Sequence, residues 1–156
     1  MSEWQSGSGA RVSYGDIIEL AKNHSSKKGT IFIGTDSHVE KKECIFSTVI
    51  CFHGAEDQIG GCYFYKKTRF KAFKFPTILE RITLEVEKSV QLSLDLHSKC
   101  PEADIEIHLD ISDSHKNNGT SKFAEMLTGY ARGAGFNYKI KPDAYAATSV
   151  ADKHSK

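Results

Sequence analysis

Two aspartates stand at the ends of apolar, strand-like runs. Asp36 follows Ile31–Ile33 after a glycine and a threonine, and Asp110 lies near the end of a run that begins at Asp104. A carboxylate this close to a buried strand is costly unless it caps a loop, pairs with a cation or binds a metal. If the two strands are neighbours, the two acids repel each other unless a cation lies between them. Because oxygen ligands suit hard cations, the pair predicts a Mg²⁺ or Mn²⁺ site, with simple loop capping as the alternative.

A third acidic ligand is expected from the long helix predicted over residues 76–98, where three glutamates compete. At 100° per residue, the buried face of this helix is defined by Leu79, Ile82, Val86 and Val90. Glu85 borders that face, whereas Glu80 and Glu87 point nearly away from it. An inward ligand must flank the buried face, so Glu85 is the predicted third ligand. Glu80, nearer the start of the helix, is the alternative.

Three histidines lie near these acids in the sequence. His38 follows Asp36 by two residues and His108 precedes Asp110 by two, and residues two apart on a strand share a face. Both are therefore candidate auxiliary groups for metal or substrate phosphate, and a hydrogen-bonded structural role is the alternative. His115, in a polar loop, is a candidate proton donor because the ordinary pKa of histidine suits that task.

A basic aromatic ribbon, defined as residues 63–75, alternates cations with rings. Its first four cations, Lys66, Lys67, Arg69 and Lys71, are candidates for neutralising phosphates, and its rings for stacking on bases. The alternative is an edge strand protected by lysines, with its rings in the core. The two interpretations are compatible, because this strand is expected at the edge of the sheet.

The elements that must position these residues alternate between strand and helix patterns. Short links between the first three strands imply an antiparallel meander, and the long helix is a crossover to a fourth strand that runs parallel to an earlier one. A loose polar segment, residues 1–12, precedes a single domain, residues 13–156. The expected strands are 30–39, 44–52, 61–70, 104–111 and 136–141, and the expected helices are 14–23, 76–98, 121–133 and 144–156.

Composition limits the classes of protein. The chain has 156 residues, 39% hydrophobic and 26% charged, which is typical of one globular domain. Its net charge of +1 gives no whole-molecule signal for nucleic acid, so a polyanion site requires local clustering of cations. The spacing of the four cysteines fits neither a zinc knuckle nor a redox pair, which indicates reduced thiols and a cytoplasmic chain. No apolar run approaches the roughly 18 residues of a membrane span.

The order of elements and acids resembles that of the ribonuclease H-like superfamily. Ile-Gly-Thr-Asp-Ser-His near the start, His-Leu-Asp-Ile in the middle and Ser-Val-Ala-Asp-Lys at the end resemble a bacterial and phage family within it. The resemblance implies an α/β fold with a mixed five-stranded sheet in the order 3-2-1-4-5, strands 1–3 antiparallel, and helices on both faces. It also implies carboxylates that hold divalent metal for phosphodiester cleavage. Asp152 matches the tail position of the family as a fourth acid, with Asp143 as the alternative.

Two functions are compatible with these patterns. The first is a metal-dependent nuclease acting on RNA or DNA, with Asp36, Glu85, Asp110 and Asp152 as its acids. The second is a non-catalytic nucleic-acid-binding or scaffolding module on the same fold, because fold alone does not settle activity.

Overall fold

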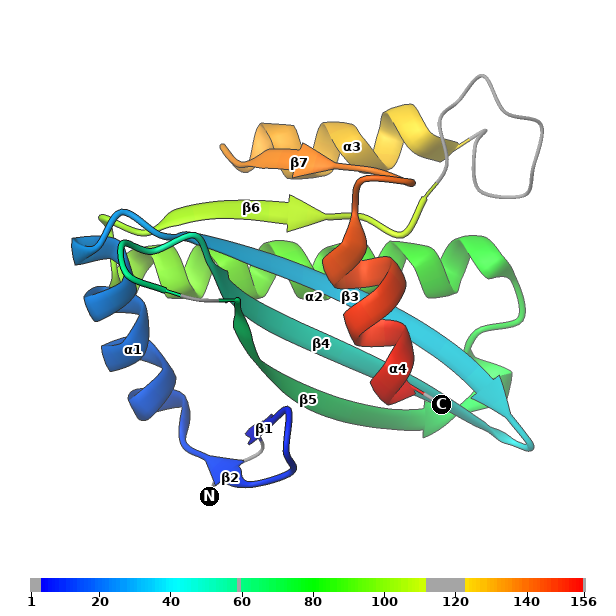
Figure 1. Ribbon diagram of the computed structural model, residues 1–156. Helices are drawn as coiled ribbons and strands as arrows, with labels where there is room; N and C mark the ends of the chain where they lie inside the picture. The colour runs from blue at the N-terminus through cyan, green and yellow to red at the C-terminus, as the bar shows by residue number, and fades with distance from the viewer. Residues whose placement is uncertain (1–3, 59, 112–122, 156) are drawn as a thin grey trace.

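The computed structural model describes residues 4–58, 60–111 and 123–155, and its centre is one seven-stranded mixed sheet (Figure 1). The order across the sheet is β2-β1-β5-β4-β3-β6-β7. The strands are β1 (Trp4–Ser6), β2 (Arg11–Val12), β3 (Thr30–Glu40), β4 (Glu43–His53), β5 (Cys62–Lys71), β6 (Asp104–His108) and β7 (Asn137–Lys139).

Five of these strands confirm the predicted order 3-2-1-4-5. β3, β4 and β5 form the antiparallel meander, and β6 and β7 add in parallel on the far side of β3. The sheet therefore extends the predicted one by two short strands at the β5 edge. β6 ends three residues before the predicted boundary, so Asp110 lies in the segment that follows the strand.

The N-terminal segment differs from the loose one that was expected. β1 pairs with β2, and it also adds to β5 through Gln5 opposite Tyr65 and Ser6 opposite Phe64. The cause is Trp4, whose side chain is only 6% exposed within the main apolar cluster. Burying a tryptophan contributes enough free energy to fix a Gly/Ser-rich hairpin that composition alone marks as mobile.

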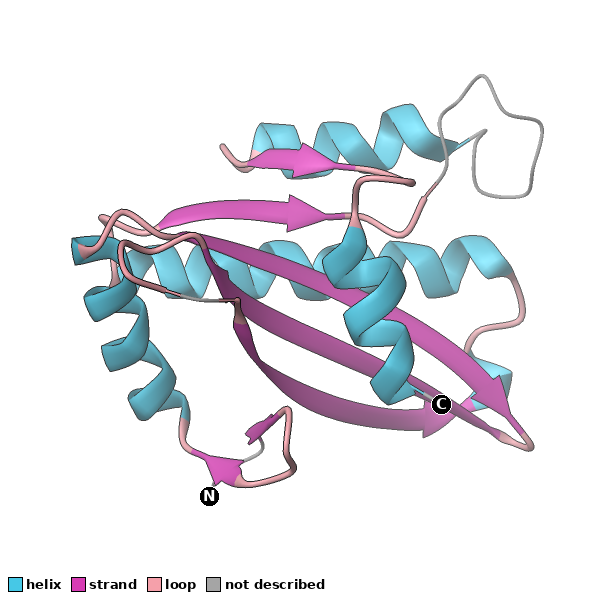
Figure 2. Ribbon diagram, in the orientation of Figure 1, coloured by secondary structure: helices cyan, strands magenta, loops and turns pink. Residues whose placement is uncertain are grey.

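Helices cover both faces of the sheet (Figure 2). They are α1 (Tyr14–Ser26), α2 (Ile78–Lys99), α3 (Ala124–Gly133), a π-helical segment η3 (Ala146–Ala151) and α4 (Asp152–Ser155), and η1 (Ala72–Lys74) is a short 3₁₀ helix. α1 and α2 pack on one face, against Ile31, Ile33 and their neighbours. η3 and α4 pack on the other, over β3 and β4. The last helix was predicted as one unit, and a wider π-helical turn starts it instead.

α2 begins with a capping box, two residues after the predicted start at residue 76. Thr77 is the N-cap; its hydroxyl accepts from the backbone N–H of Glu80, and the Glu80 carboxylate accepts from that of Thr77. Pro76 therefore lies before the helix. None of the described helices is long and apolar enough to cross a membrane.

Candidate metal centre

The candidate metal centre lies beside β3, at the point where its parallel neighbour β6 ends. The two strands pair in parallel from Thr30 opposite Asp104 to Gly34 opposite His108, and β3 then runs on to Glu40. Asp36 lies just past this last pair, and Asp110 follows the end of β6 by two residues. Because the carboxyl ends of parallel neighbours meet at the same edge, the two aspartates come together in the open space beside β3.

Glu85 reaches the same place from α2. The Ser37 hydroxyl donates to the Glu85 carboxylate, so Ser37 faces α2 and its neighbour Asp36 faces the other side of the sheet. There the hydroxyl of Ser155, on α4, donates to Asp36 at 3.4 Å. Figure 1 shows α2 and α4 on opposite faces of β3. Asp36, Glu85 and Asp110 each present a carboxylate oxygen within 4.8 Å of the others.

Burial and the neighbouring negative charges raise the pKa values of two of the three acids. Burial raises the pKa of Asp36 to about 9, helped by a hydrogen bond with Asp110, by the charges of Glu85 and Asp110 and by a hydrogen bond with Asp152. Burial also raises the pKa of Glu85 to about 8, although the hydrogen bond from Ser37 opposes this shift. Both side chains are about 5% exposed. The centre therefore favours protons at neutral pH when no other cation is present.

Two cations of the chain offset this charge in part. Lys141 places its Nζ 3.1 Å from Oδ1 of Asp110, and it is 42% exposed. The charge of Arg81, one turn before Glu85 on α2, lowers the pKa of that glutamate. Three convergent carboxylates fit a hard divalent cation such as Mg²⁺ or Mn²⁺, because such ions prefer oxygen ligands.

The alternative acids lie elsewhere or at the margin. Glu80 and Glu87 are exposed and Glu85 is buried, so the helical-face argument predicted the orientation of all three. The carboxylate of Glu80 is used in the capping box of α2. Asp152 contacts Asp36 through a side-chain hydrogen bond, whereas Asp143 is exposed.

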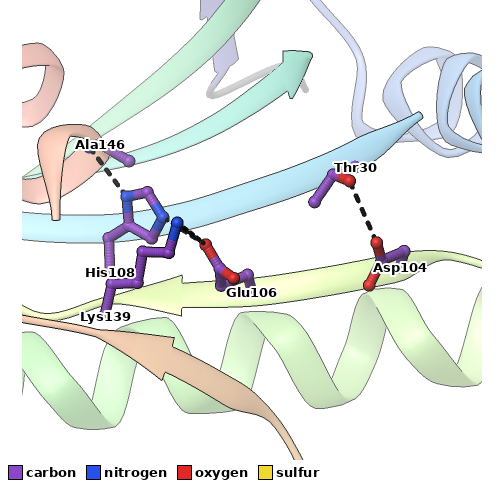
Figure 3. Close-up of polar contacts among 6 residues, drawn as sticks. All are labelled: Thr30, Asp104, Glu106, His108, Lys139 and Ala146. Carbon is purple, nitrogen blue, oxygen red and sulfur yellow. Dashed lines mark hydrogen bonds and ion pairs between the residues drawn. The ribbon is translucent and has the colours of Figure 1, made fainter. Parts of the chain in front are cut away.

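His108 has hydrogen bonds at both ring nitrogens, which agrees with the structural role predicted for it and not with the role of an auxiliary ligand (Figure 3). Its Nδ1 accepts from the backbone N–H of Ala146 at 3.1 Å, and its Nε2 lies 3.0 Å from a carboxylate oxygen of Glu106. An accepting Nδ1 requires the proton on Nε2, so the neutral ring donates to Glu106. With 1% of its surface exposed and both ring nitrogens in hydrogen bonds, His108 has no nitrogen left to bind a metal or a phosphate. Burial lowers its pKa, which keeps the ring neutral.

Of the other two candidate histidines, the structure describes His38. His38 is half-buried on β3, and its role beside the acids stays a prediction. His115 lies outside the described residues. Three neighbours of the acids escaped the sequence analysis: Ser37, Lys141 and Ser155. The orientation of Ser37 could have been predicted, because successive side chains of a strand point to opposite faces of the sheet. The residue next to Asp36 therefore faces α2.

The basic aromatic ribbon is divided between the two faces of the sheet. Lys66 lines a cavity under α2. Lys67 instead lies near His154 on α4, whose pKa is lowered by burial and by the charges of Lys153 and Lys67. Arg69 forms an ion pair of 3.7 Å with Glu43 on the neighbouring strand. β1 pairs with β5 only at Phe64 and Tyr65, so the basic half of β5 has no strand beyond it within the described chain. Of the predicted phosphate-binding group, Lys66 is therefore separated from Lys67.

The rings of the ribbon are mostly used internally. Phe64 is buried, and Phe70 packs edge-on against Phe46. Tyr65 stacks on His154 with ring centres 3.7 Å apart, and the hydroxyl of Tyr63 lies 2.8 Å from Nε2 of that histidine. These contacts hold α4 on the sheet. The prediction that the rings lie in the core is confirmed for Phe64, whereas Phe70 is only half-buried.

A sheet of this order, with acids from β3, from α2 and from the segment after β6 that converge, is typical of a ribonuclease H-like protein. The chain belongs to the family described as "Ribonuclease H-like", which it matches over residues 13–156. It is also similar to "Uncharacterized protein YkuK" of Bacillus subtilis (strain 168), with 27% identity over 166 residues. That similarity covers 94% of this chain and 93% of the relative. No solved structure matches the chain.

Proposed function

We propose that this protein is a divalent-metal-dependent nuclease that hydrolyses phosphodiester bonds of RNA or DNA. One observation carries the proposal: Asp36, Glu85 and Asp110 bring carboxylate oxygens within 4.8 Å of one another in a ribonuclease H-like chain. Burying like charges this closely costs free energy that a divalent cation would offset. Mg²⁺ or Mn²⁺ is therefore the proposed cofactor.

The side chains of the centre have distinct proposed roles. Asp36, Glu85 and Asp110 hold the metal, and Ser37 orients Glu85 through its hydrogen bond. Bound there, a divalent ion would supply Lewis-acid activation of water and neutralise charge on the phosphate. Asp152 borders the centre through Asp36 and is the proposed fourth acid. Each of these groups sits on a strand, on a helix or directly after one, which limits its movement.

Recognition of the polyanion is assigned to cations near this centre. Lys141 lies beside Asp110 and is partly exposed, so a phosphate that approaches the acids meets its ammonium group. Lys67, Arg69 and Lys71 on β5 are exposed and supply further phosphate contacts. The four cysteines are free thiols, which supports the cytoplasmic location that we propose.

The experiment compares two glutamates of one helix. Cleavage of single-stranded, double-stranded and hybrid substrates is measured in Mg²⁺ and in Mn²⁺. Glu85→Gln is expected to lose at least about 100-fold in rate, because metal positioning and charge stabilisation fail together. Glu80→Gln is the matched control: glutamine also completes a capping box, so this variant should fold and cleave like the wild type. Equal loss in both variants would contradict the assignment of Glu85.

A second function, a non-catalytic nucleic-acid-binding module, is favoured by one observation. Asp110 already has an ion pair with Lys141, and the pKa of Asp36 is raised to about 9, so the acids can persist without metal. If the wild type cleaves none of the three substrate types in any divalent metal but still binds them, the binding module replaces the nuclease.

A further inference from the structure

A separate cavity of about 430 Å³ lies on the α2 face of the sheet. Its walls come from α2, β5, the N-terminal strand β1 and the start of α1. A volume of this size is in the range of small-molecule pockets. None of the three clustered carboxylates of the metal centre lines it.

One end of the cavity is cationic. Lys66 from β5 and Lys88 from α2 both line it, and both are half-buried. The Nζ of Lys88 lies 5.5 Å from the centre of the Phe70 ring. Burial lowers the pKa of Lys88, and the charge of Lys66 lowers it further. Two like charges in a shared, poorly solvated space repel each other, and a bound anion would remove that repulsion.

Hydroxyl groups complete this end. Thr48 and Thr68, on the neighbouring strands β4 and β5, line the cavity with the two lysines. The Thr35 hydroxyl donates to that of Thr48 at 3.2 Å, so Thr48 accepts this bond and can donate its own proton to a ligand. Ammonium and hydroxyl donors from both walls at this end match the oxygens of a phosphate group.

The other end is apolar and aromatic. Lys88, Leu92 and Asp95 lie along one stripe of α2, which spans about 10 Å from first to last. Tyr14 lies at this end, and its ring stacks on that of Trp4 with ring centres 6.2 Å apart. Trp4 precedes Gln5, which pairs with Tyr65 next to Lys66, so Trp4 connects the two ends. The Tyr14 hydroxyl donates to Asp95 at 2.6 Å, which fixes the tyrosine ring against the helix. The cavity is thus elongated, with anion donors at one end and rings with a carboxylate at the other.

We propose that this cavity binds a phosphorylated small molecule of mononucleotide size. Its phosphate lies between Lys66 and Lys88, and its ring lies against Tyr14 and Leu92. The proposal does not depend on the nuclease activity, because it uses none of the clustered acids.

Trp4 provides a local probe, because it is the single tryptophan of the chain and lines the cavity. Its fluorescence is followed while the full chain is titrated with adenosine monophosphate, ribose 5-phosphate, inorganic phosphate or adenosine. EDTA is present throughout, so that metal at the acidic centre contributes nothing. We expect saturable one-to-one binding of adenosine monophosphate, weaker binding of ribose 5-phosphate and phosphate, and weak binding of adenosine. Calorimetry checks the stoichiometry.

Three variants locate the site. Lys66→Met and Lys88→Met, tested separately so that a folding defect in one leaves the other informative, should each weaken binding by about tenfold or more. Lys88→Arg should recover most of the affinity. Lys42→Met is the matched control, because this exposed lysine in the turn between β3 and β4 does not line the cavity, and it should bind like the wild type. No saturable change with adenosine monophosphate, or unchanged affinity in both methionine variants, would overturn the site. Equal affinity for phosphate and adenosine monophosphate would overturn the mononucleotide assignment.

Discussion

Replacement of Glu85 by glutamine should stabilise the metal-free protein at neutral and alkaline pH. Glu85 is 5% exposed, and its pKa is raised to about 8, whereas the unfolded chain ionises it near 4.5. An acid whose pKa is higher in the folded than in the unfolded chain contributes its full stabilisation at pH values below the unfolded-state pKa. That stabilisation is lost as the pH rises through the folded-state pKa. The penalty that Glu85 imposes therefore grows from about pH 4.5 and levels off above about pH 8.

The size of this effect follows from the two pKa values. Holding Glu85 protonated at pH 7, against an ordinary pKa of 4.5, costs on the order of 3 kcal/mol of folding free energy. Glutamine carries no charge, and its carbonyl oxygen can still accept from Ser37, so the variant avoids this cost. We therefore expect near-equal stabilities at pH 4.5 and a gain of a few kcal/mol for Glu85→Gln at pH 8.

Urea unfolding in EDTA at a series of pH values measures the difference. Glu87→Gln is the matched control, because this exposed neighbour on the same helix should leave the pH dependence unchanged. Addition of Mn²⁺ at pH 8 should stabilise the wild type and stabilise Glu85→Gln much less. If Glu85→Gln instead destabilises the protein increasingly as pH rises, Arg81 holds Glu85 ionised and the argument from burial fails.

Two further predictions concern residues outside the acids. Changing Lys67, Arg69 and Lys71 together to alanine should weaken polynucleotide binding for all sequences alike and flatten its salt dependence. An unchanged salt dependence would show that these residues do not contact phosphates and only protect the edge strand β5. His108→Ala should lower the free energy of unfolding by about 2–4 kcal/mol, because it opens a cavity and leaves a backbone N–H unpaired. Calorimetric titration should then show unchanged Mn²⁺ affinity in the folded variant, whereas a large loss of affinity would return His108 to the metal centre.

The antiparallel meander and the parallel crossover could be predicted from local patterns, whereas the full order 3-2-1-4-5 was implied by the resemblance to the ribonuclease H-like superfamily. Apolar runs identify the strands, and the long crossover helix predicts that the fourth strand runs parallel to an earlier one, which the structure shows to be β3. The angular position of Glu85 beside Ile82 and Val86 follows from helix geometry alone, and the burial of these three residues agrees with it. These inferences needed no knowledge of contacts between distant segments.

The errors came from contacts between segments far apart in the chain. The role of His108 depends on Ala146, 38 residues later, so strand spacing gave its face but not its partners. The N-terminal hairpin depends on Trp4 packing in the main cluster, which outweighs the composition of the segment. The division of Lys66 from Lys67 is different, because strand alternation already separates adjacent residues. That error came from treating the ribbon as one surface.

The most direct test is to locate bound metal. Crystals of the wild type are soaked in Mn²⁺ at pH 8, and anomalous diffraction is recorded near the manganese absorption edge. We predict an anomalous peak bounded by the carboxylates of Asp36, Glu85 and Asp110, and its loss in the double variant Asp36→Asn with Asp110→Asn. Anomalous density at other positions only, or none at saturating Mn²⁺, would contradict the assignment of these three acids as a metal centre.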